Sequence, residues 1–193
     1  MDNCLIAITG GIGSGKTCAL EIFKSLGEKT VSCDEITNEV YLIPHVIKTV
    51  GKVFPTAKKG FFKKRLDKRE IARIVFSDKQ KLEWLTQELT PLILKKCLHR
   101  ANLLGGRVFI EVPLLFERFA QNEFDKIIVI SRDKEERIQS VINRSNLTRE
   151  EVLARMNSQF DYDNADLSAY TVISNDGNVN NLKEKLVEFI KHM

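Results

Sequence analysis

The chain has few of the residues, and none of the spacings, that build metal centres or disulfide frameworks. Its four cysteines are scattered through 193 residues without a C-x-x-C pair. Its three histidines show no spacing typical of a metal site or a catalytic triad. A resident metal cluster and a network of disulfides are therefore not expected, and the cysteines are expected to be reduced.

Long apolar runs are also missing. The first apolar run is only Leu5–Ile8 and ends at a glycine-rich loop, which makes it too short for a signal peptide or a membrane span. The expectation is a cytoplasmic protein with no membrane partner. The net charge of +4 is mild. It suits anionic small molecules as well as nucleic acid, so charge alone does not choose a partner.

Short β-branched runs alternate with longer amphipathic stretches, and this alternation predicts the fold class. Runs of strand length are Leu5–Thr9, Thr30–Cys33, Val108–Val112, Ile127–Ile130 and Thr171–Ile173. Parallel strands need long crossover connections, and the amphipathic stretches supply helices for them. The sequence therefore predicts an α/β fold with a parallel sheet covered on both faces.

Residues 41–105 interrupt this alternation, because they contain no convincing buried strand. Helix starts are signalled instead by "LDKRE", from Asp67, and by "SDKQ", from Ser77, both of which have the spacing of a capping box. Pro91 lies inside an otherwise helical stretch and is expected to kink or divide it. The region is predicted to be an inserted helical lobe.

Residues 133–159 form a second interruption with two predicted helices. Thr148 and Glu151, three residues apart, predict a capping box at the start of the second helix. Both interruptions are interpreted as insertions into one core. The predicted organisation is a core of residues 1–40, 106–132 and 160–193, a lobe of residues 41–105, and a small lid of residues 133–159.

The stretch "GGIGSGKT" carries the clearest chemistry. Gly10, four residues and then Gly15-Lys16-Thr17 make the phosphate-binding P-loop, placed between a predicted strand and a predicted helix. Backbone amides of such a loop converge on phosphate oxygens, and the helix N-terminus adds its positive end. Lys16 is expected to reach the β- and γ-phosphates, and the Thr17 hydroxyl is expected to bind Mg²⁺.

Two carboxylates follow other predicted strands. Asp34 is placed at the end of the second strand, where it could take a proton from an acceptor hydroxyl. It could equally cap the following helix. Glu111 ends the third strand, at a position that suits a carboxylate near Mg²⁺. A structural or substrate-side role for Glu111 is at least as well supported, because Asp is the usual residue for the metal role.

Arginines mark the second inserted region. Arg137 and Arg144 are seven residues apart on one helical face, and Arg155 lies on the next helix. Arginines on a hinged lid could neutralise a transferring phosphoryl group. We interpret Arg144 and Arg155 in this way, and Arg137 as part of a solvated charged face.

The basic stretch "KKGFFKKRLDKR", Lys58–Arg69, leaves three possibilities open. It could bind nucleic acid through phosphate contacts and aromatic stacking. It could hold the phosphates of a small acceptor. It could also be a plain exposed loop, which is the commonest explanation for such a stretch.

Taken together, the motifs "ITGGIGSGKT", "SCDEIT", "LDKREIARIVFSD", "TPLI", "EVPLLFE" and "RMNSQ" have the order and spacing of one family. The chain resembles dephospho-CoA kinase over nearly its whole length. The resemblance implies a P-loop core with a five-stranded parallel sheet, a helical acceptor lobe and a lid. It also implies ATP-dependent phosphorylation of the ribose 3′-hydroxyl of dephospho-CoA, with Mg²⁺, in a monomer or weak homo-oligomer with no nucleic-acid partner.

The resemblance also assigns roles to individual residues. It implies catalytic roles for Asp34 as the base, for Lys16 and, from the lid, for Arg144. ATP would be bound by Gly11, Ile12, Gly13, Ser14, Gly15, Lys16, Thr17, Arg144 and Arg155, with Asn175 near the adenine. The acceptor would be bordered by Asp34, Lys68, Pro113, Leu114 and Leu115.

The chain departs from the family pattern on the acceptor side. Ser32 and Lys68 stand where the family usually has Asp and Arg, and Lys68 keeps the charge without the two-pronged guanidinium. A different small-molecule kinase on the same core is the nearest rival, but it would not require "EVPLLFE". A regulatory GTPase would need DxxG and NKxD motifs, and neither occurs in the chain.

Overall fold

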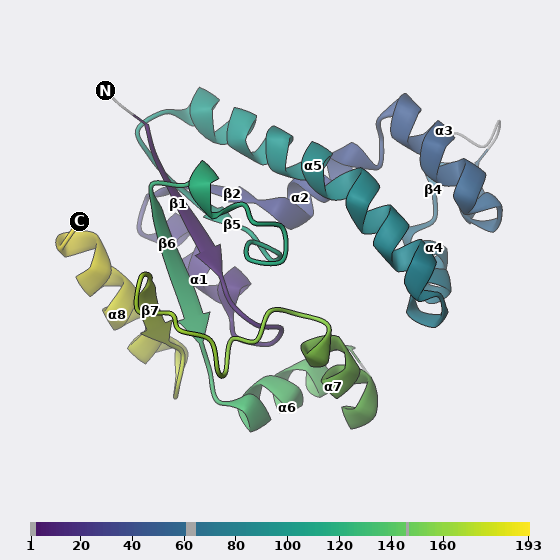
Figure 1. Cartoon of the computed structure of the whole chain (residues 1–193). Coiled ribbons are helices and arrows are strands. Elements are labelled where there is room, and N and C mark those ends of the chain that lie inside the picture. Colours follow the sequence, from purple (N-terminus) through teal and green to yellow (C-terminus); the bar gives the residue numbers. More distant parts are fainter. Residues whose placement is uncertain (1–2, 61–64, 146) are drawn as a thin grey trace. The chain divides into compact units, whose positions relative to one another are not determined.

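Two compact units make up the chain in the computed structural model, which describes residues 3–60, 65–145 and 147–193 (Figure 1). The first unit contains Met1–Ser32 and Ala101–Met193, and the second contains Cys33–Arg100. Helix α5 (Lys79–Leu104) runs from the second unit into the first. In the described part of the chain, no helix is both long and apolar enough to cross a membrane.

A five-stranded parallel sheet forms the centre of the first unit. Its order is β2-β5-β1-β6-β7, with β1 in the middle. The strands are β1 (Cys4–Thr9), β2 (Lys29–Ser32), β5 (Arg107–Glu111), β6 (Lys126–Ser131) and β7 (Thr171–Ser174). All five predicted strands and the predicted parallel α/β architecture are confirmed. The β-branched runs become strands because both faces of a parallel sheet are buried.

Helices α1 (Lys16–Ser25) and α8 (Val179–Lys191) pack together against one face of this sheet. On α1, the ring of Phe23 stacks on that of Phe109 in β5 with the centroids 3.8 Å apart. Both side chains are fully buried, and burying an aromatic side chain of this size contributes about 1.5–3 kcal/mol. This packing fixes where α1 begins, and therefore where the loop before it lies.

Helices α6 (Lys134–Ser145) and α7 (Arg149–Asn157) follow β6. Figure 1 shows α6 just beyond the arrowhead of β6. The two helices share a small apolar cluster around Ile138, Val141 and Val152. The predicted capping box is confirmed, since Thr148 accepts a hydrogen bond from the amide of Glu151, whose carboxylate accepts one from the amide of Thr148.

The second unit is mainly helical, as predicted for this part of the chain. Its core includes Val50, Phe54, Ile71 and Leu89, all buried. Its elements are α2 (Cys33–Val40), α3 (Pro44–Val53), the 3₁₀ turn η1 (Pro55–Ala57), β3 (Lys58–Lys59), β4 (Arg65–Leu66), α4 (Lys68–Ser77) and most of α5. The two-residue strands β3 and β4 pair antiparallel. Phe61 and Phe62 of the predicted basic stretch lie outside the described residues.

Local details in this unit correct two expectations. Helix α5 continues through Pro91 and is not divided there, because buried side chains such as Leu89 and Cys97 hold the helix on both sides of the one amide that proline lacks. The capping box expected at Ser77 is wrong. Ser77 is the last residue of α4, and Asp78 instead accepts a hydrogen bond from the amide of Lys81 at 3.0 Å.

The capping box expected at Asp67 is only half formed. The Asp67 carboxylate caps α4 by accepting hydrogen bonds from the amides of Arg69 and Glu70. The Glu70 carboxylate is engaged by Arg73 and Thr56 instead, and the amide of Asp67 donates to the Ala57 carbonyl at 2.7 Å. The turn at η1 therefore supplies the acceptor that Glu70 was expected to supply.

Candidate nucleotide-binding site

The loop between β1 and α1 has a backbone that favours glycine, as its first and last positive-φ glycines show. Gly10 and Gly15 have φ angles of 146° and 99°. A Cβ atom on Gly15 would lie 2.2 Å from Nδ2 of Asn175, and one on Gly10 would lie 2.3 Å from the carbonyl oxygen of Ile130. Glycine at these positions lets the loop pass close to the ends of β6 and β7.

The N-terminus of α1 is arranged to receive an anion. The N-cap residue is Gly15, no side chain caps this end among the described residues, and the first turn contains no acid. Its amides can therefore point at a ligand, and the helix dipole favours negative charge there. The ammonium of Lys16 donates to the carbonyl oxygens of Gly10 and Gly11 at 2.8 and 3.0 Å, which holds a cation over the same loop.

Two oxygen-bearing side chains meet at the carboxyl edge of the sheet. The Thr17 hydroxyl donates to Oε1 of Glu111 at 2.9 Å. Glu111 ends β5 and is 3% exposed. Hydroxyl and carboxylate oxygens are the ligand types that Mg²⁺ prefers, so this pair fits a Mg²⁺ site completed by waters and phosphate oxygens. No group of three or more His, Cys, Asp or Glu side chains suited to a metal occurs among the described residues.

Asn175 fixes the loop from the far side. It follows β7, its backbone amide donates to the Ser131 carbonyl at 2.8 Å, and its side-chain Nδ2 donates to the Ser14 carbonyl at 2.8 Å. The hydroxyl of Ser14 is itself buried, with no hydrogen-bond partner among the described residues. The sequence-predicted residues Ser14, Gly15, Lys16, Thr17 and Asn175 are thus brought together in one unit of the chain.

Arg137 corrects the sequence interpretation. It was expected on a solvated charged face, but it is only 4% exposed. Its Nη2 donates to both carboxylate oxygens of Asp163, at 2.5 and 2.7 Å. Its Nη1 lies against the phosphate-binding loop, only 2.5 Å from where a Cβ on Gly11 would be. Buried Val141, one helical turn further on, could have indicated that Arg137 faces inward.

A segment after α7, Gln159–Asp163, was not recognised from the sequence as part of the site, and we call it the strap. The side-chain carbonyl of Gln159 accepts the amide of Ile12 at 2.8 Å. The hydroxyls of Tyr162 and Thr9 are 3.0 Å apart and share a hydrogen bond. Burial raises the pKa of Tyr162 to about 12, so its hydroxyl stays neutral. The motif "RMNSQ" contains Gln159 and was the one sequence signal for the strap.

The two lid arginines singled out from the sequence have different surroundings. Arg144 is exposed in the last turn of α6 and lines a hollow on that helix with Arg132 and Glu136. Arg155 is half-buried in the last turn of α7, and burial lowers the pKa of its guanidinium. An arginine remains charged at neutral pH even so, and both side chains can therefore serve as cations.

The acceptor-side residues are divided between the two units. Strand β2 ends at Ser32, so the expectation that it ends in Asp34 is wrong, and Asp34 is exposed in the first turn of α2. Lys68 begins α4, donates to the side chain of Asn38 and lies 5.5 Å from the Tyr41 ring centroid. In the turn after β5 of the first unit, Pro113 and Leu114 are half-buried and Leu115 is buried.

Comparison with known proteins identifies the family. The family model for dephospho-CoA kinase matches residues 4–181. A dephospho-CoA kinase from Thermus thermophilus is 32% identical over 183 residues, which cover 94% of this chain and 88% of the relative.

Solved structures agree with that match. A crystal structure from Thermus thermophilus superposes with a TM-score of 0.81 at 30% identity, covering 100% of this chain and 99% of the other. The dephospho-CoA kinase from Campylobacter jejuni gives 0.67 at 26% identity, covering 98% and 97%. The chain therefore belongs to the dephospho-CoA kinase family, the kinases that use ATP to phosphorylate dephospho-CoA and so make coenzyme A.

Proposed function

We propose that this chain transfers the γ-phosphoryl group of ATP to the ribose 3′-hydroxyl of dephospho-CoA. The observation that carries the proposal is the complete P-loop between β1 and α1, with Lys16 held over it, in a chain that belongs to this family. The acceptor oxygen forms a bond to the γ-phosphorus while the bond to the β–γ bridging oxygen breaks. The hydroxyl proton goes to a carboxylate, and ADP leaves.

The phosphates of ATP are assigned to Gly11–Thr17. The backbone amides at the start of α1 contact them, and Lys16 leaves its two carbonyl partners to bind the β- and γ-phosphates. Asn175, anchored to the same loop, borders the adenine. Arg144 and Arg155 act from the lid of residues 133–159, where their positive charge stabilises the transferring group.

Thr17 and Glu111 are assigned to Mg²⁺, the first as a direct ligand and the second through water. Their oxygens already lie within hydrogen-bond distance of each other. When bound, the ion would neutralise part of the charge of the triphosphate. The Thr17 hydroxyl oxygen would then face the ion with its lone pairs, while the hydroxyl keeps its proton and still donates a hydrogen bond to the Glu111 carboxylate.

The acceptor is assigned to residues 41–105 and to the turn after β5. Asp34 takes the proton of the 3′-hydroxyl and orients that oxygen for in-line attack. Support comes from chain position, since Asp34 follows by two residues the end of β2, where Ser32 pairs with Glu111 at the carboxyl edge of the sheet. Lys68 offers a cation to the acceptor phosphates, and Pro113, Leu114 and Leu115 form an apolar border.

A competition between acceptors tests the proposal. The purified protein is incubated with MgATP and an equimolar mixture of dephospho-CoA, adenosine, AMP and shikimate, and the products are identified by mass spectrometry. We expect coenzyme A as the main product. If ATP is consumed and a different acceptor is phosphorylated, the protein is still a P-loop kinase, but the assignment of dephospho-CoA as its acceptor is wrong. No transfer at all would contradict the proposed activity.

A second prediction concerns the ion pair between buried Arg137 and exposed Asp163. Arg137→Lys keeps a positive charge but loses the planar guanidinium, whose Nη2 donates to both carboxylate oxygens of Asp163 and whose Nη1 lies against the loop at Gly11. We expect the Kd for ATP to rise about tenfold, equivalent to about 1.4 kcal/mol. Isothermal titration of each variant with ATP measures this effect.

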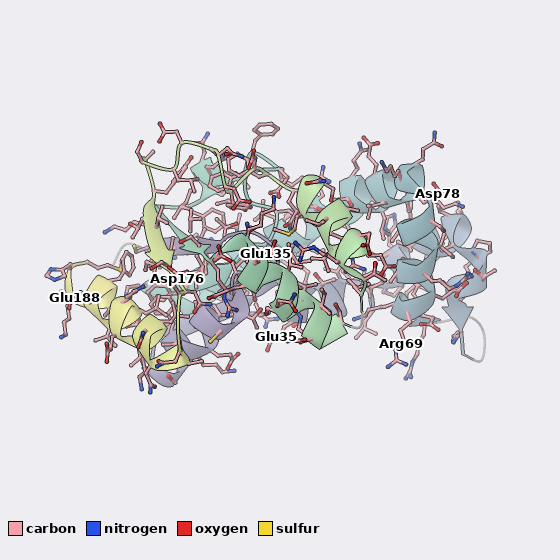
Figure 2. The ribbon with its side chains drawn as sticks, turned by 90° about the horizontal axis from the view of Figure 1, so that it is seen from below. Glu35, Arg69, Asp78, Glu135, Asp176 and Glu188 are labelled. Atoms are coloured by element: carbon pink, nitrogen blue, oxygen red, sulfur yellow. The ribbon has the colours of Figure 1, made fainter. Side chains whose placement is uncertain are left out.

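The control is the same change in the same lid. Arg149 of α7 forms a two-pronged pair with Glu135 of α6, which is labelled in Figure 2, and both side chains are exposed. Exposed pairs contribute only about 0.2–1 kcal/mol, so Arg149→Lys should leave the Kd for ATP within about twofold of wild type. Equal effects of the two substitutions would show that Arg137 does not position the loop.

A further inference from the structure

Two cysteines of the second unit lie in contact inside its core. The Sγ atoms of Cys33 and Cys97 are 3.2 Å apart, and their side chains are 6% and 0% exposed. Cys33 is the first residue of α2, and Cys97 lies in α5, 64 positions further along the chain. A disulfide has a sulfur–sulfur distance of about 2.05 Å, so an approach of about 1 Å would join the two sulfurs.

The other two cysteines have different surroundings. Cys4, in β1, and Cys18, in α1, belong to the first unit and pack against the apolar core beneath the sheet. Both are half-buried, and burial raises the pKa of the Cys18 thiol. Cys33 and Cys97 therefore differ from the rest in having a second sulfur within reach.

We propose that Cys33 and Cys97 are a redox modification site that forms a reversible disulfide on exposure to a peroxide. The Cys33 sulfur, the more exposed of the two, attacks one oxygen of hydrogen peroxide, giving a sulfenic acid and one water. The Cys97 sulfur then attacks the Cys33 sulfur, and the hydroxyl group leaves with the Cys97 proton as a second water. Two thiols are oxidised, and one peroxide is reduced to two waters.

The modification adjoins a residue of the proposed reaction. Asp34 directly follows Cys33 in the first turn of α2, so a bond from Cys33 to α5 moves the backbone that carries the Asp34 carboxylate. A misplacement of about 1 Å at a reacting group can lower the rate about a hundredfold. This consequence rests on the proposed function, whereas formation of the disulfide does not.

Mass spectrometry of the whole protein tests the site without an activity assay. The reduced chain is treated with hydrogen peroxide in small excess, and the intact mass is measured. We expect a loss of about 2 Da, a cross-linked peptide joining Cys33 to Cys97, and full reversal by dithiothreitol. Gains of oxygen without a cross-link, or a cross-link involving Cys4 or Cys18, would overturn the proposal.

Variants divide the chemistry into its steps. Cys18→Ser should lose the same 2 Da, whereas Cys97→Ser should stop at a Cys33 sulfenic acid that dimedone traps. If Cys97→Ser fails to fold, Cys97→Ala serves the same purpose, and the peptide map of the native chain needs no variant. The assigned order would be overturned if dimedone labelled Cys97 in a Cys33→Ser variant but did not label Cys33 in the Cys97→Ser variant.

Turnover measured on the oxidised chain tests the link to Asp34. We expect kcat with dephospho-CoA to fall about tenfold or more on disulfide formation and to return on reduction, with the Kd for ATP unchanged. A cross-linked chain with unchanged kcat would overturn this link. A reduced chain that never phosphorylates dephospho-CoA would count against the proposed function alone, because the mass test does not depend on it.

Discussion

Replacing Asp34 with Asn is expected to lower kcat about a thousandfold while the Kd for ATP stays within about twofold, because a positioned general base contributes about 10²–10⁴-fold to a rate. Asn has the shape of Asp but cannot accept the proton of the acceptor hydroxyl. The residues proposed to bind ATP belong to the other unit of the chain, so nucleotide binding should be preserved. Single-turnover kinetics and ATP titration measure the two quantities separately.

This substitution also separates the two roles that the sequence left open for Asp34. Asn caps a helix about as well as Asp does, so a capping residue would tolerate the change. The matched control is Glu35→Gln, which removes a charge from the next residue of the same turn (Figure 2) and should leave kcat within about twofold of wild type. An Asp34→Asn variant with most of its activity would show that Asp34 is not the base.

Replacing Lys16 with Ala should weaken both binding and turnover. The ammonium sits over the phosphate-binding loop, within 3.0 Å of two of its carbonyl oxygens, and it is the one side-chain cation that we assign directly to the β- and γ-phosphates. We expect the Kd for ATP to rise at least about tenfold, or 1.4 kcal/mol, and kcat to fall about 10²–10³-fold, the size of effect seen when one charge-stabilising donor is removed.

Lys24→Ala is the control for that experiment. Lys24 is exposed in the last turn of the same helix, α1, so its removal tests for a general effect of lost charge on the nucleotide. It should leave Kd and kcat within about twofold of wild type. Normal turnover in Lys16→Ala would contradict the assignment of the loop to ATP phosphates.

How far the sequence predicts this protein depends on the range of the interactions involved. The five strands and the P-loop were predictable because each is encoded in a short run, in β-branched residues or in glycine spacing. The end of β2 was misplaced by two residues, since Cys33 and Asp34 fit a strand end and a helix start equally well. The capping box was misplaced at Ser77, one residue before Asp78, for the same local reason.

Arg137 shows what local patterns miss. Its neighbours Glu135 and Glu136 suggested a solvated face, while its actual partner, Asp163, is 26 residues away in the chain. Gln159 and Ile12 are 147 residues apart. No periodicity or spacing reports such pairs, because they exist only once β1, α6 and the strap have been brought together by burial of the core.

The ion pair of buried Arg137 and exposed Asp163 also fixes the first turn of α6. The first turn of that helix is held to the strap and lies against Gly11, while Arg144 lies seven residues further on, about 10 Å along the axis. Arg144 is therefore on the same helix as the turn that contacts the phosphate-binding loop, a short distance from that contact. A rotation of α6 by about 20° around that point would move the guanidinium about 3–4 Å.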